Sequence, residues 1–356
     1  MISNRQLLIG LAASGRIQVQ IGSTFSEIPR TLPAGFDFGR VEGMMLGLAI
    51  GDALGNTSEA RLPARRYKEH GEIRDYLQDT GCPSDDSQLA FWTLEQMIAD
   101  CGFVPEHVLA RFSKGEIFGI GRTVQAALAA LAAGSAWQQC GRESAANGAL
   151  MRIAPILIPH LRTASPDLWA DTALCAMITH NDSAAIASAV AFVALLWELL
   201  AMDAPPPPEW FLARFVAVLR DLECRDYEPR SPHIADFNGP LWRFLEQELP
   251  AAFDQKLPVL EVCNRWYSGA YLLETVPCVL YTLMRCGHDP EEAIVRAVND
   301  TRDNDTVAAI VGAAVGALHG REGLPHRWIE GLSGRTTATD DGRMFELLGA
   351  ARELWG

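Results

Sequence analysis

Two short acidic segments, far apart in the chain, carry the residue types best suited to metal chemistry. Each combines carboxylates with a hydroxyl and stands at the start of a segment with the apolar pattern of a helix. The residues concerned are Ser84, Asp85, Asp86, Asp303, Asp305 and Thr306. Carboxylate and hydroxyl oxygens are ligands that Mg²⁺ and Mn²⁺ prefer. If the two helices pack side by side, these oxygens converge on one centre.

Helix capping is the alternative explanation of these segments. Asp, Ser and Thr are good N-caps, and acidic side chains in a first turn complement the helix dipole. Capping explains one acid of each segment, whereas neighbouring carboxylates repel each other and gain from a cation between them. The occurrence of two similar segments therefore favours a shared centre of one or two divalent cations. Capping can still hold for one of the side chains.

The elements that must position these residues have helical patterns. Residues 41–55 are apolar almost all round, which predicts a buried helix, and the main domain contains no convincing central strand. We therefore expect an all-α fold. The glycines of this helix lower its propensity, so they predict close backbone packing against another helix. Asp52 lies within the same apolar surface and needs a partner such as a nearby helix end. Residues 223–238 are charged and predict a surface loop.

Several turns offer groups for an anionic or ring-shaped ligand. Residues 114–123 form a glycine-rich turn before an alanine-rich helix, and exposed amides at a helix N-terminus bind anions well. An Asn-Gly turn precedes Arg152, and His180 stands at a helix end. Tyr271 belongs to an aromatic, glycine-containing loop that could stack a flat ring. An ordinary turn, a capping histidine and simple loop packing are the respective alternatives.

Composition limits the classes of function. The 356 residues are 49% hydrophobic and 21% charged, which is typical of a globular protein with a large core. The net charge of −14 argues against nucleic acid or an anionic membrane as a partner. The eight cysteines show neither a Cys-x-x-Cys pair nor zinc-site spacing, so we expect reduced thiols in a cytoplasmic protein. The longest apolar run, residues 184–197, is too short for a membrane span and predicts a buried helix.

The N-terminal residues 1–38 differ from the rest of the chain. Residues 17–21 alternate apolar and polar side chains, as a strand does, and residues 23–38 are rich in Ser, Thr, Pro and Gly. We expect a short non-helical extension over residues 1–38 and a main domain over residues 39–356. The extension could lie in a partner's cleft, pack on its own domain or form an oligomer contact.

Five ordered motifs resemble the ADP-ribosylglycohydrolase family, which includes the dinitrogen reductase-activating glycohydrolases and the ADP-ribosylarginine hydrolases. The matching motifs are Gly43-x-x-x-Gly47-x-x-x-Gly51-Asp52-Ala53-Leu54-Gly55 with Glu59 just after, Ser84-Asp85-Asp86, Asn147-Gly148-x-x-Met151-Arg152-x-x-Pro155, Thr179-His180 and Asp303-x-Asp305-Thr306. The resemblance runs from about residue 43 to residue 320. The motifs are far more specific in combination than any one of them alone.

The resemblance implies a compact all-α fold with a dinuclear Mg²⁺ centre, for which Mn²⁺ could substitute. The implied reaction is hydrolysis of the N-glycosidic bond between ADP-ribose and an arginine of an ADP-ribosylated protein. The implied metal ligands are Ser84, Asp85, Asp86, Asp303, Asp305 and Thr306, with Glu59 close by. The residues implied to hold the phosphates, riboses and adenine are Gly119, Gly121, Arg122, Thr123, Asn147, Gly148, His180 and Tyr271.

The chain departs from the family pattern at two of these positions. Ser84 replaces a threonine and keeps the hydroxyl ligand. Gly119 stands where many arginine-specific relatives carry an aspartate that is a candidate base. We therefore assign the catalytic base role to Glu59, or to a metal-bound water oriented by Asp86. A serine-linked or O-acetyl ADP-ribosyl substrate is the alternative.

The resemblance also suggests a partner protein. Some members of the family are immunity proteins against antibacterial ADP-ribosyltransferase toxins, and an N-terminal extension that docks on the toxin occurs among them. Residues 1–38 could act in this way, with or without hydrolysis by the main domain. A non-catalytic toxin-binding protein is thus a further alternative.

Overall fold

The computed structural model describes residues 2–234 and 236–356, which form α-helices joined by turns and short 3₁₀ helices. The α-helices are α1 (Asn4–Ala13), α2 (Gly39–Asn56), α3 (Pro63–His70), α4 (Asp85–Asp100), α5 (Pro105–Phe112), α6 (Arg122–Ala132), α7 (Asp167–Met177), α8 (Ser183–Leu199), α9 (Pro208–Leu222), α10 (Leu241–Asp254), α11 (Val259–Trp266), α12 (Leu272–Cys286), α13 (Pro290–Asp300), α14 (Asn304–His319), α15 (His326–Gly331) and α16 (Arg343–Trp355). Apart from isolated bridges, these two ranges contain no β-strand. The predicted all-α fold is confirmed.

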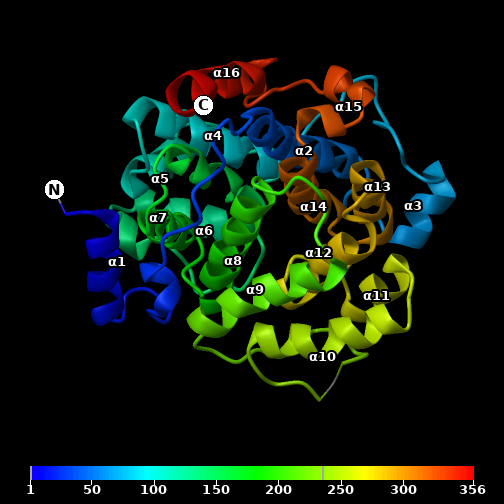
Figure 1. Ribbon diagram of the computed structural model, residues 1–356, viewed down its shortest axis with the longest axis horizontal. Coiled ribbons are helices and arrows are strands. Elements are labelled where there is room, and N and C mark those ends of the chain that lie inside the picture. The colour runs from blue at the N-terminus through cyan, green and yellow to red at the C-terminus, as the bar shows by residue number, and fades with distance from the viewer. Residues whose placement is uncertain (1, 235) are drawn as a thin grey trace.

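The centre of the fold is a close lengthwise contact between α2 and α14 (Figure 1). Glycines at every fourth position of α2 face α14. A Cβ built on Gly47 would lie 2.1 Å from the carbonyl oxygen of Gly312, and one on Gly51 would lie 2.0 Å from that of Ala308. Ordinary carbon contacts are about 3.5–4.0 Å long, so any side chain here would push the helices apart. The predicted close backbone packing is confirmed, with α14 as the partner.

This contact places the end of α2 beside the start of α14. A Cβ on Gly55 would lie 2.4 Å from the Cα of Asp305. The side-chain amide of Asn304 donates to the carbonyl oxygen of Gly55 at 3.1 Å and to the hydroxyl of Ser58 at 3.0 Å. The second acidic segment is therefore fixed against the turn that carries Glu59.

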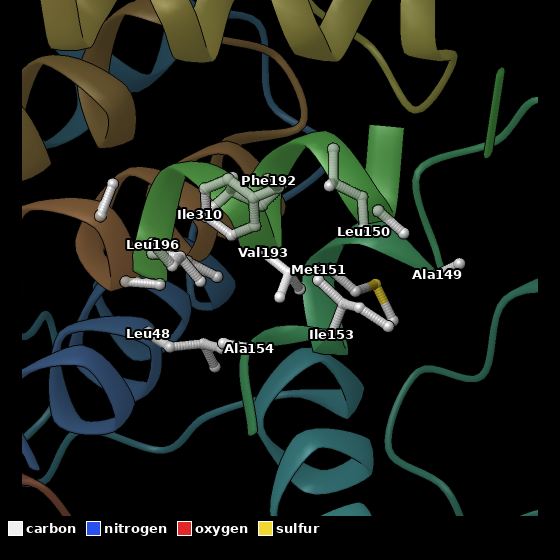
Figure 2. Close-up of a cluster of buried hydrophobic side chains, with 14 of the residues drawn as sticks. Leu48, Ala149, Leu150, Met151, Ile153, Ala154, Phe192, Val193, Leu196 and Ile310 are labelled. Carbon is white, nitrogen blue, oxygen red and sulfur yellow. The ribbon is translucent and has the colours of Figure 1, made fainter. Parts of the chain in front are cut away.

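The hydrophobic core surrounds the helix pair. Leu48 of α2 and Ile310 of α14 belong to a buried cluster with Phe192 and Val193 of α8 and the segment around Leu150 (Figure 2). Helix α8 is buried along almost its whole length, which confirms the prediction of a buried helix there. Within the described parts of the chain, no helix is both long and apolar enough to cross a bilayer.

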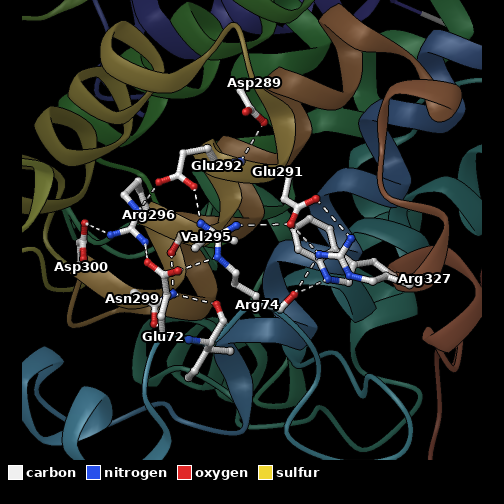
Figure 3. A network of polar contacts seen from close by, with 12 residues as sticks. Glu72, Arg74, Asp289, Glu291, Glu292, Val295, Arg296, Asn299, Asp300 and Arg327 are labelled. Atoms are coloured by element: carbon white, nitrogen blue, oxygen red, sulfur yellow. Dashed lines mark hydrogen bonds and ion pairs between the residues drawn. The ribbon is translucent and has the colours of Figure 1, made fainter.

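Ion pairs on the outside of the molecule tie α13 to its neighbours (Figure 3). Arg74 pairs with Glu292 at 2.8 Å, and Arg296 pairs with the same carboxylate at 2.9 Å. Arg327 at the start of α15 reaches Glu291 at 2.6 Å. A single exposed ion pair contributes little, but several that share partners form a network. This network holds α13, and α13 leads directly into the second acidic segment.

The structure corrects the expectation that the N-terminal extension is non-helical. Helix α1 begins with a capping box in which Ser3 and Gln6 exchange hydrogen bonds. This Ser-x-x-Gln signal was present in the sequence. Residues 17–21 contain bends and form no strand in the described structure, because no strand lies beside them to complete a ladder. The backbone amide of Gln20 instead donates to the carbonyl oxygen of Leu222 at 3.0 Å.

The extension packs on its own domain. Asp221 of α9 accepts hydrogen bonds from the backbone amide and the hydroxyl of Thr24, both at 2.8 Å. The indole N–H of Trp169 donates to the carbonyl oxygen of Glu27 at 2.8 Å. Phe25 is buried in the core. One side of the extension is thus used within the chain, and docking of a partner on its outer side stays a prediction.

Candidate metal and ligand site

One cavity of about 620 Å³ brings nearly all the predicted site residues together. The predicted residues that line it are Glu59, Asp85, Asp86, Gly119, Gly121, Arg122, Thr123, Asn147, Gly148, His180, Tyr271, Asp303, Asp305 and Thr306. They come from the starts of α4, α6, α12 and α14 and from the turns between other helices. Ser84 is the predicted residue that does not line the cavity.

The start of α4 is held in place by Asp52 of α2. The backbone amide of Ser84 donates to Asp52 Oδ1 at 2.8 Å, and the amide and hydroxyl of Ser87 donate to Oδ2 at 3.0 and 2.6 Å. The expected helix-end partner of Asp52 is thus found. Ser84 is the N-cap of α4, and its hydroxyl donates to Asp86 Oδ2 at 3.2 Å. Because Ser84 serves as the cap, the carboxylates of Asp85 and Asp86 are left for another role.

The start of α14 is linked to both sides of the cavity. Asp303 occupies the N-cap position, yet its side chain makes no capping hydrogen bond. Its Oδ2 accepts from the side-chain amide of Asn147 at 2.6 Å, and the same amide nitrogen donates to Thr275 Oγ1 at 3.0 Å. The hydroxyl of Thr306 lies 3.4 Å from Asp86 Oδ2. The two acidic segments therefore meet, and Asn147 acts as the group that orients Asp303.

The crowded carboxylates fit a divalent cation. Oxygens of Asp52, Asp86 and Asp305 all lie within 4.8 Å of one another, as do those of Glu59, Asp303 and Asp305. Asp86 Oδ1 is buried and has no hydrogen-bond partner among the described residues. Buried like charges at such separations are costly unless a positive charge lies between them. Since the Asp52 oxygens are already engaged by α4, the other carboxylates are the better ligands.

Burial and mutual repulsion raise the pKa values of these acids. Burial, reinforced by Asp52, raises the pKa of Asp85 to about 8, and burial raises that of Asp303 to about 6. The pKa values of Asp86 and Asp305 also lie well above the usual range, because both groups are buried among other carboxylates. A cation bound between these carboxylates would favour their deprotonated forms.

A buried arginine shapes the turn that precedes Asp303. Arg66 of α3 is fully buried, and its Nη1 donates to the carbonyl oxygens of Val298 at 2.8 Å and Thr301 at 2.9 Å. Burial lowers the pKa of Arg66 to about 10, and nearby Asp305 opposes that shift. Arg66 thus stays charged at neutral pH and caps the C-terminal end of α13 by donating to its last carbonyl groups. In the sequence, Arg66 is one of several polar residues in a short helix, and no pattern distinguishes it as a buried residue.

The glycine-rich turn leads into α6 at the wall of the cavity. Gly121 precedes α6, and no side chain caps the first turn of that helix. Gly119 has φ of +61°, in the left-handed region that favours glycine. A Cβ built there would lie 3.8 Å from Asp85 Oδ1, so the turn lies against the start of α4. The cavity therefore combines carboxylates with the uncapped helix N-terminus suited to an anion.

His180 forms part of the cavity wall although it is only 1% exposed. Its Nδ1 lies 2.9 Å from Thr179 Oγ1. A Cβ on Gly148 would lie 2.9 Å from its Cε1 and 3.1 Å from its Nε2, so glycine keeps this edge of the ring clear. Burial, with the nearby charge of Arg152, lowers the pKa of His180 to about 3. The imidazole is neutral at physiological pH.

Arg230 is a cavity residue that the sequence did not reveal. Its guanidinium lies 4.9 Å from the ring centroid of Tyr271, and its Nε and Nη2 each donate to Glu274 at 2.8 Å. The Glu274 side chain is 1% exposed, whereas that of Arg230 is 60% exposed. Arg230 lies in the charged surface loop 223–238, where nothing in the pattern distinguishes it from its charged neighbours. Arginine thus covers part of the ring that was expected to stack on a ligand.

Comparison with known proteins places this cavity in context. A sequence model of the ADP-ribosylglycohydrolase family matches residues 35–355. ADP-ribosylarginine hydrolase Tri1 of Pseudomonas putida is 28% identical over 309 residues, covering 82% of this chain and 73% of the relative. ADP-ribosylhydrolase ARH3 of Bos taurus is 23% identical over 342 residues, covering 83% and 89%. A solved structure described as an ADP-ribosylglycohydrolase-related protein complex superimposes with a TM-score of 0.67 at 26% identity, covering 91% of this chain and all of that one.

Proposed function

The chain belongs to the ADP-ribosylglycohydrolase family, and we propose that it hydrolyses the N-glycosidic bond between ADP-ribose and a protein arginine. The observation that carries this proposal is one cavity that joins a cluster of carboxylates to an uncapped helix N-terminus. The carboxylates suit a cationic centre at the scissile bond, and the helix N-terminus suits a diphosphate. The likeness to an ADP-ribosylarginine hydrolase supports arginine as the linkage.

The glycine-rich side of the cavity is where we place the diphosphate. A protein with a net charge of −14 must bind a dianion through local groups. The first-turn amides of α6 have no side-chain cap, and Arg122 and Arg230 both line the cavity. Gly148 and His180 would contact a ribose, and Tyr271 with Arg230 would flank the adenine. The volume of about 620 Å³ falls within the range of small-molecule sites.

Two Mg²⁺ ions are the cofactor we propose for the acidic side. Asp85, Asp86, Asp303, Asp305 and Thr306 would hold them, and Mn²⁺ could take their place. Ser84 contributes indirectly, because its hydroxyl is bonded to Asp86 and does not reach the cavity wall. When bound, such ions supply Lewis-acid polarisation and make water more acidic.

Glu59 is the residue we propose as the base. Hydrolysis breaks the bond between ribose C1 and the guanidine nitrogen, and the oxygen of a water molecule bonds to C1. One proton of that water goes to the Glu59 carboxylate and the other stays on the new C1 hydroxyl. The proton taken up by Glu59 is then passed to the leaving guanidine nitrogen, which restores the carboxylate. Glu59 lines the cavity at an exposed position, and no described residue hydrogen-bonds to its carboxylate. Although the residue is exposed as a whole, partial desolvation of its carboxylate within the cavity and the charge of nearby Asp52 raise its pKa, which strengthens it as a proton acceptor. Asp86 would orient the water.

A different ADP-ribosyl adduct is the second candidate substrate. The position of Gly119 favours it, because an acidic side chain there would project beside Asp85, and this chain has none. The likeness to an ADP-ribosylhydrolase named ARH3 points the same way. Parallel assays on arginine-linked, serine-linked and O-acetyl ADP-ribose separate the two candidates. Faster release from a serine-linked or O-acetyl substrate would replace the arginine proposal.

The proposed centre is tested by exchanging one carboxylate for an amide. Asp85→Asn should reduce hydrolysis of ADP-ribosylarginine at saturating Mg²⁺ by about 100-fold or more, because loss of even an outer partner of a metal site typically costs 10–100-fold. Asp100→Asn is the matched control, since Asp100 ends the same helix and pairs with His107 outside the cavity. Equal activities of the two variants would refute the assigned centre.

A further inference from the structure

We propose that Arg152, acting through Thr179, holds His180 in the tautomer that carries its proton on Nε2. The imidazole then presents a fixed hydrogen-bond donor to an acceptor oxygen of the ligand. Arg152 and Thr179 are positioning residues, since neither lines the cavity. The identity of the ligand as an ADP-ribosyl group rests on the proposed function. The assignment of the proton rests on the contacts alone.

The relay begins at a fully buried arginine. Arg152 Nη2 donates to the carbonyl oxygen of Cys175 at 3.1 Å and to Thr179 Oγ1 at 2.7 Å. Its guanidinium carbon lies 5.1 Å from the ring centroid of Phe112, which encloses it further. A guanidinium is only a donor, so the Thr179 oxygen must be the acceptor in their contact. This fixes the direction of the first hydrogen bond.

The second hydrogen bond follows from the single proton of a hydroxyl. Thr179 Oγ1 lies 2.9 Å from His180 Nδ1, and Thr179 is fully buried. If Nδ1 carried the proton, the hydroxyl would accept twice, and its own proton would have no acceptor among the described residues. A buried unsatisfied donor is costly, so the hydroxyl donates to Nδ1. The neutral imidazole must then carry its proton on Nε2.

The Nε2 edge of His180 lies beside Gly148 in the wall of the cavity. Gly148 leaves this edge uncovered, because a Cβ there would come within 3.1 Å of Nε2. No hydrogen bond to Nε2 is formed by any residue of the described ranges. The pKa of His180 is lowered to about 3 by burial and by Arg152, so the ring stays neutral and the tautomer is defined. If Arg152 only stabilised the fold, the Thr179 hydroxyl would not need to contact both Arg152 and His180.

The tautomer can be measured in the ligand-free protein by ¹H–¹⁵N correlation spectra of histidine-labelled protein. For His180 we expect a protonated Nε2 and an unprotonated Nδ1 at pH 7. Thr179→Val removes the hydroxyl at nearly constant volume and should abolish this pattern, whereas Thr179→Ser should keep it. His180→Gln assigns the signal. His160, whose Nε2 pairs with Asp171 at 3.0 Å, is the internal control and should not change.

Binding then tests what the donor does. Binding of free ADP-ribose is measured by calorimetry. Thr179→Val should weaken it about tenfold, which corresponds to about 1.4 kcal/mol. Thr179→Ser should bind within about twofold of the wild-type protein. If Thr179→Val does not fold, Gly148→Ala serves instead, because it covers the Nε2 edge and should weaken binding while keeping the tautomer.

Three results would overturn the relay. They are a proton on Nδ1 of His180 in the wild-type protein, a tautomer that Thr179→Val leaves unchanged, and equal loss of binding in Thr179→Ser and Thr179→Val. The spectrum needs no substrate and no turnover. A protein that fails to hydrolyse ADP-ribosylarginine yet shows the expected tautomer would refute the proposed function and leave the relay standing.

Discussion

Replacing Gly55 by alanine tests how the α2–α14 contact positions the acidic site. Gly55 ends the row of glycines on α2, and a Cβ there would lie 2.4 Å from the Cα of Asp305. The neighbouring atom belongs to the backbone, so no side-chain rotation relieves the overlap. The start of α14 must move away from α2, and Asp305 must move with it.

The size of the effect follows from this distance. Carbon atoms in contact lie about 3.5–4.0 Å apart, so the start of α14 must shift by roughly 1 Å. Overpacking of this kind typically costs about 1–3 kcal/mol. Alanine recovers up to about 1 kcal/mol in helix propensity. We therefore expect Gly55→Ala to lower the free energy of unfolding by about 1–2 kcal/mol. A displacement of about 1 Å at a catalytic group can cost about 100-fold in rate.

Two further alanine variants separate stability from activity. Gly43 lies at the other end of the same row, where a Cβ would meet the carbonyl carbon of Gly320 at 2.4 Å. Gly43→Ala should lose similar stability and keep its activity, because twelve helical residues, or about 18 Å, separate it from Gly55. Gly349 of α16 is exposed with no atom within 4 Å of a built Cβ. Gly349→Ala should gain up to about 1 kcal/mol.

The measurements are the denaturant midpoint of unfolding and the rate of hydrolysis of ADP-ribosylarginine at saturating Mg²⁺. If Gly55→Ala is as stable as the wild-type protein, the close approach of the two helices is not what requires glycine. If Gly43→Ala loses as much activity as Gly55→Ala, the contact does not act on Asp305 locally. Either result would refute the reasoning from this distance.

Two more predictions concern the cavity. Burial raises the pKa of Asp85 to about 8, so its contribution to stability is present below about pH 4 and is lost as the pH rises through 8. Mg²⁺ should offset that loss and should raise the melting temperature more at pH 8 than at pH 5; a pH-independent increase would contradict this assignment. Arg230→Ala removes a guanidinium from the cavity edge and should raise KM about tenfold with kcat changed by less than about threefold. Arg265→Ala, which breaks a pair with Glu248 outside the cavity, is its control and should behave as wild type; an unchanged KM for Arg230→Ala would exclude Arg230 from binding.

Local patterns in the sequence were enough to predict the main elements of the fold. The apolar periodicity of residues 41–55 predicted α2, and its glycines predicted a close helix contact. The burial of Asp52 predicted a partner at a helix end, which is the start of α4. The acids at the starts of α4 and α14 predicted a shared centre, and the two segments do meet. Each of these inferences rests on a local pattern, and the shared centre rests on two such patterns of the same kind.

Misassigned or missed features depend on other parts of the chain. An alternating segment becomes a strand only beside another strand, and residues 17–21 have no such neighbour in the part of the chain that the structure describes. Arg230 becomes a residue of the cavity only when its loop folds back over Tyr271. Arg66 gains its role from carbonyl groups more than 200 residues away, at the end of α13. No local pattern encodes contacts of this kind.

The sequence by itself therefore determined which side chains could bind a cation or an anion and which helices carry them. The tertiary structure decided which of those side chains make hydrogen bonds within the protein and which are left to bind a ligand. It made Ser84 a cap, turned both N–H groups of Asn147 toward protein acceptors, and left one oxygen of Asp86 without a partner among the described residues. The physical reason is that a hydroxyl or an amide can satisfy only a few hydrogen bonds. Which of these bonds form depends on neighbours that only the folded chain brings within reach.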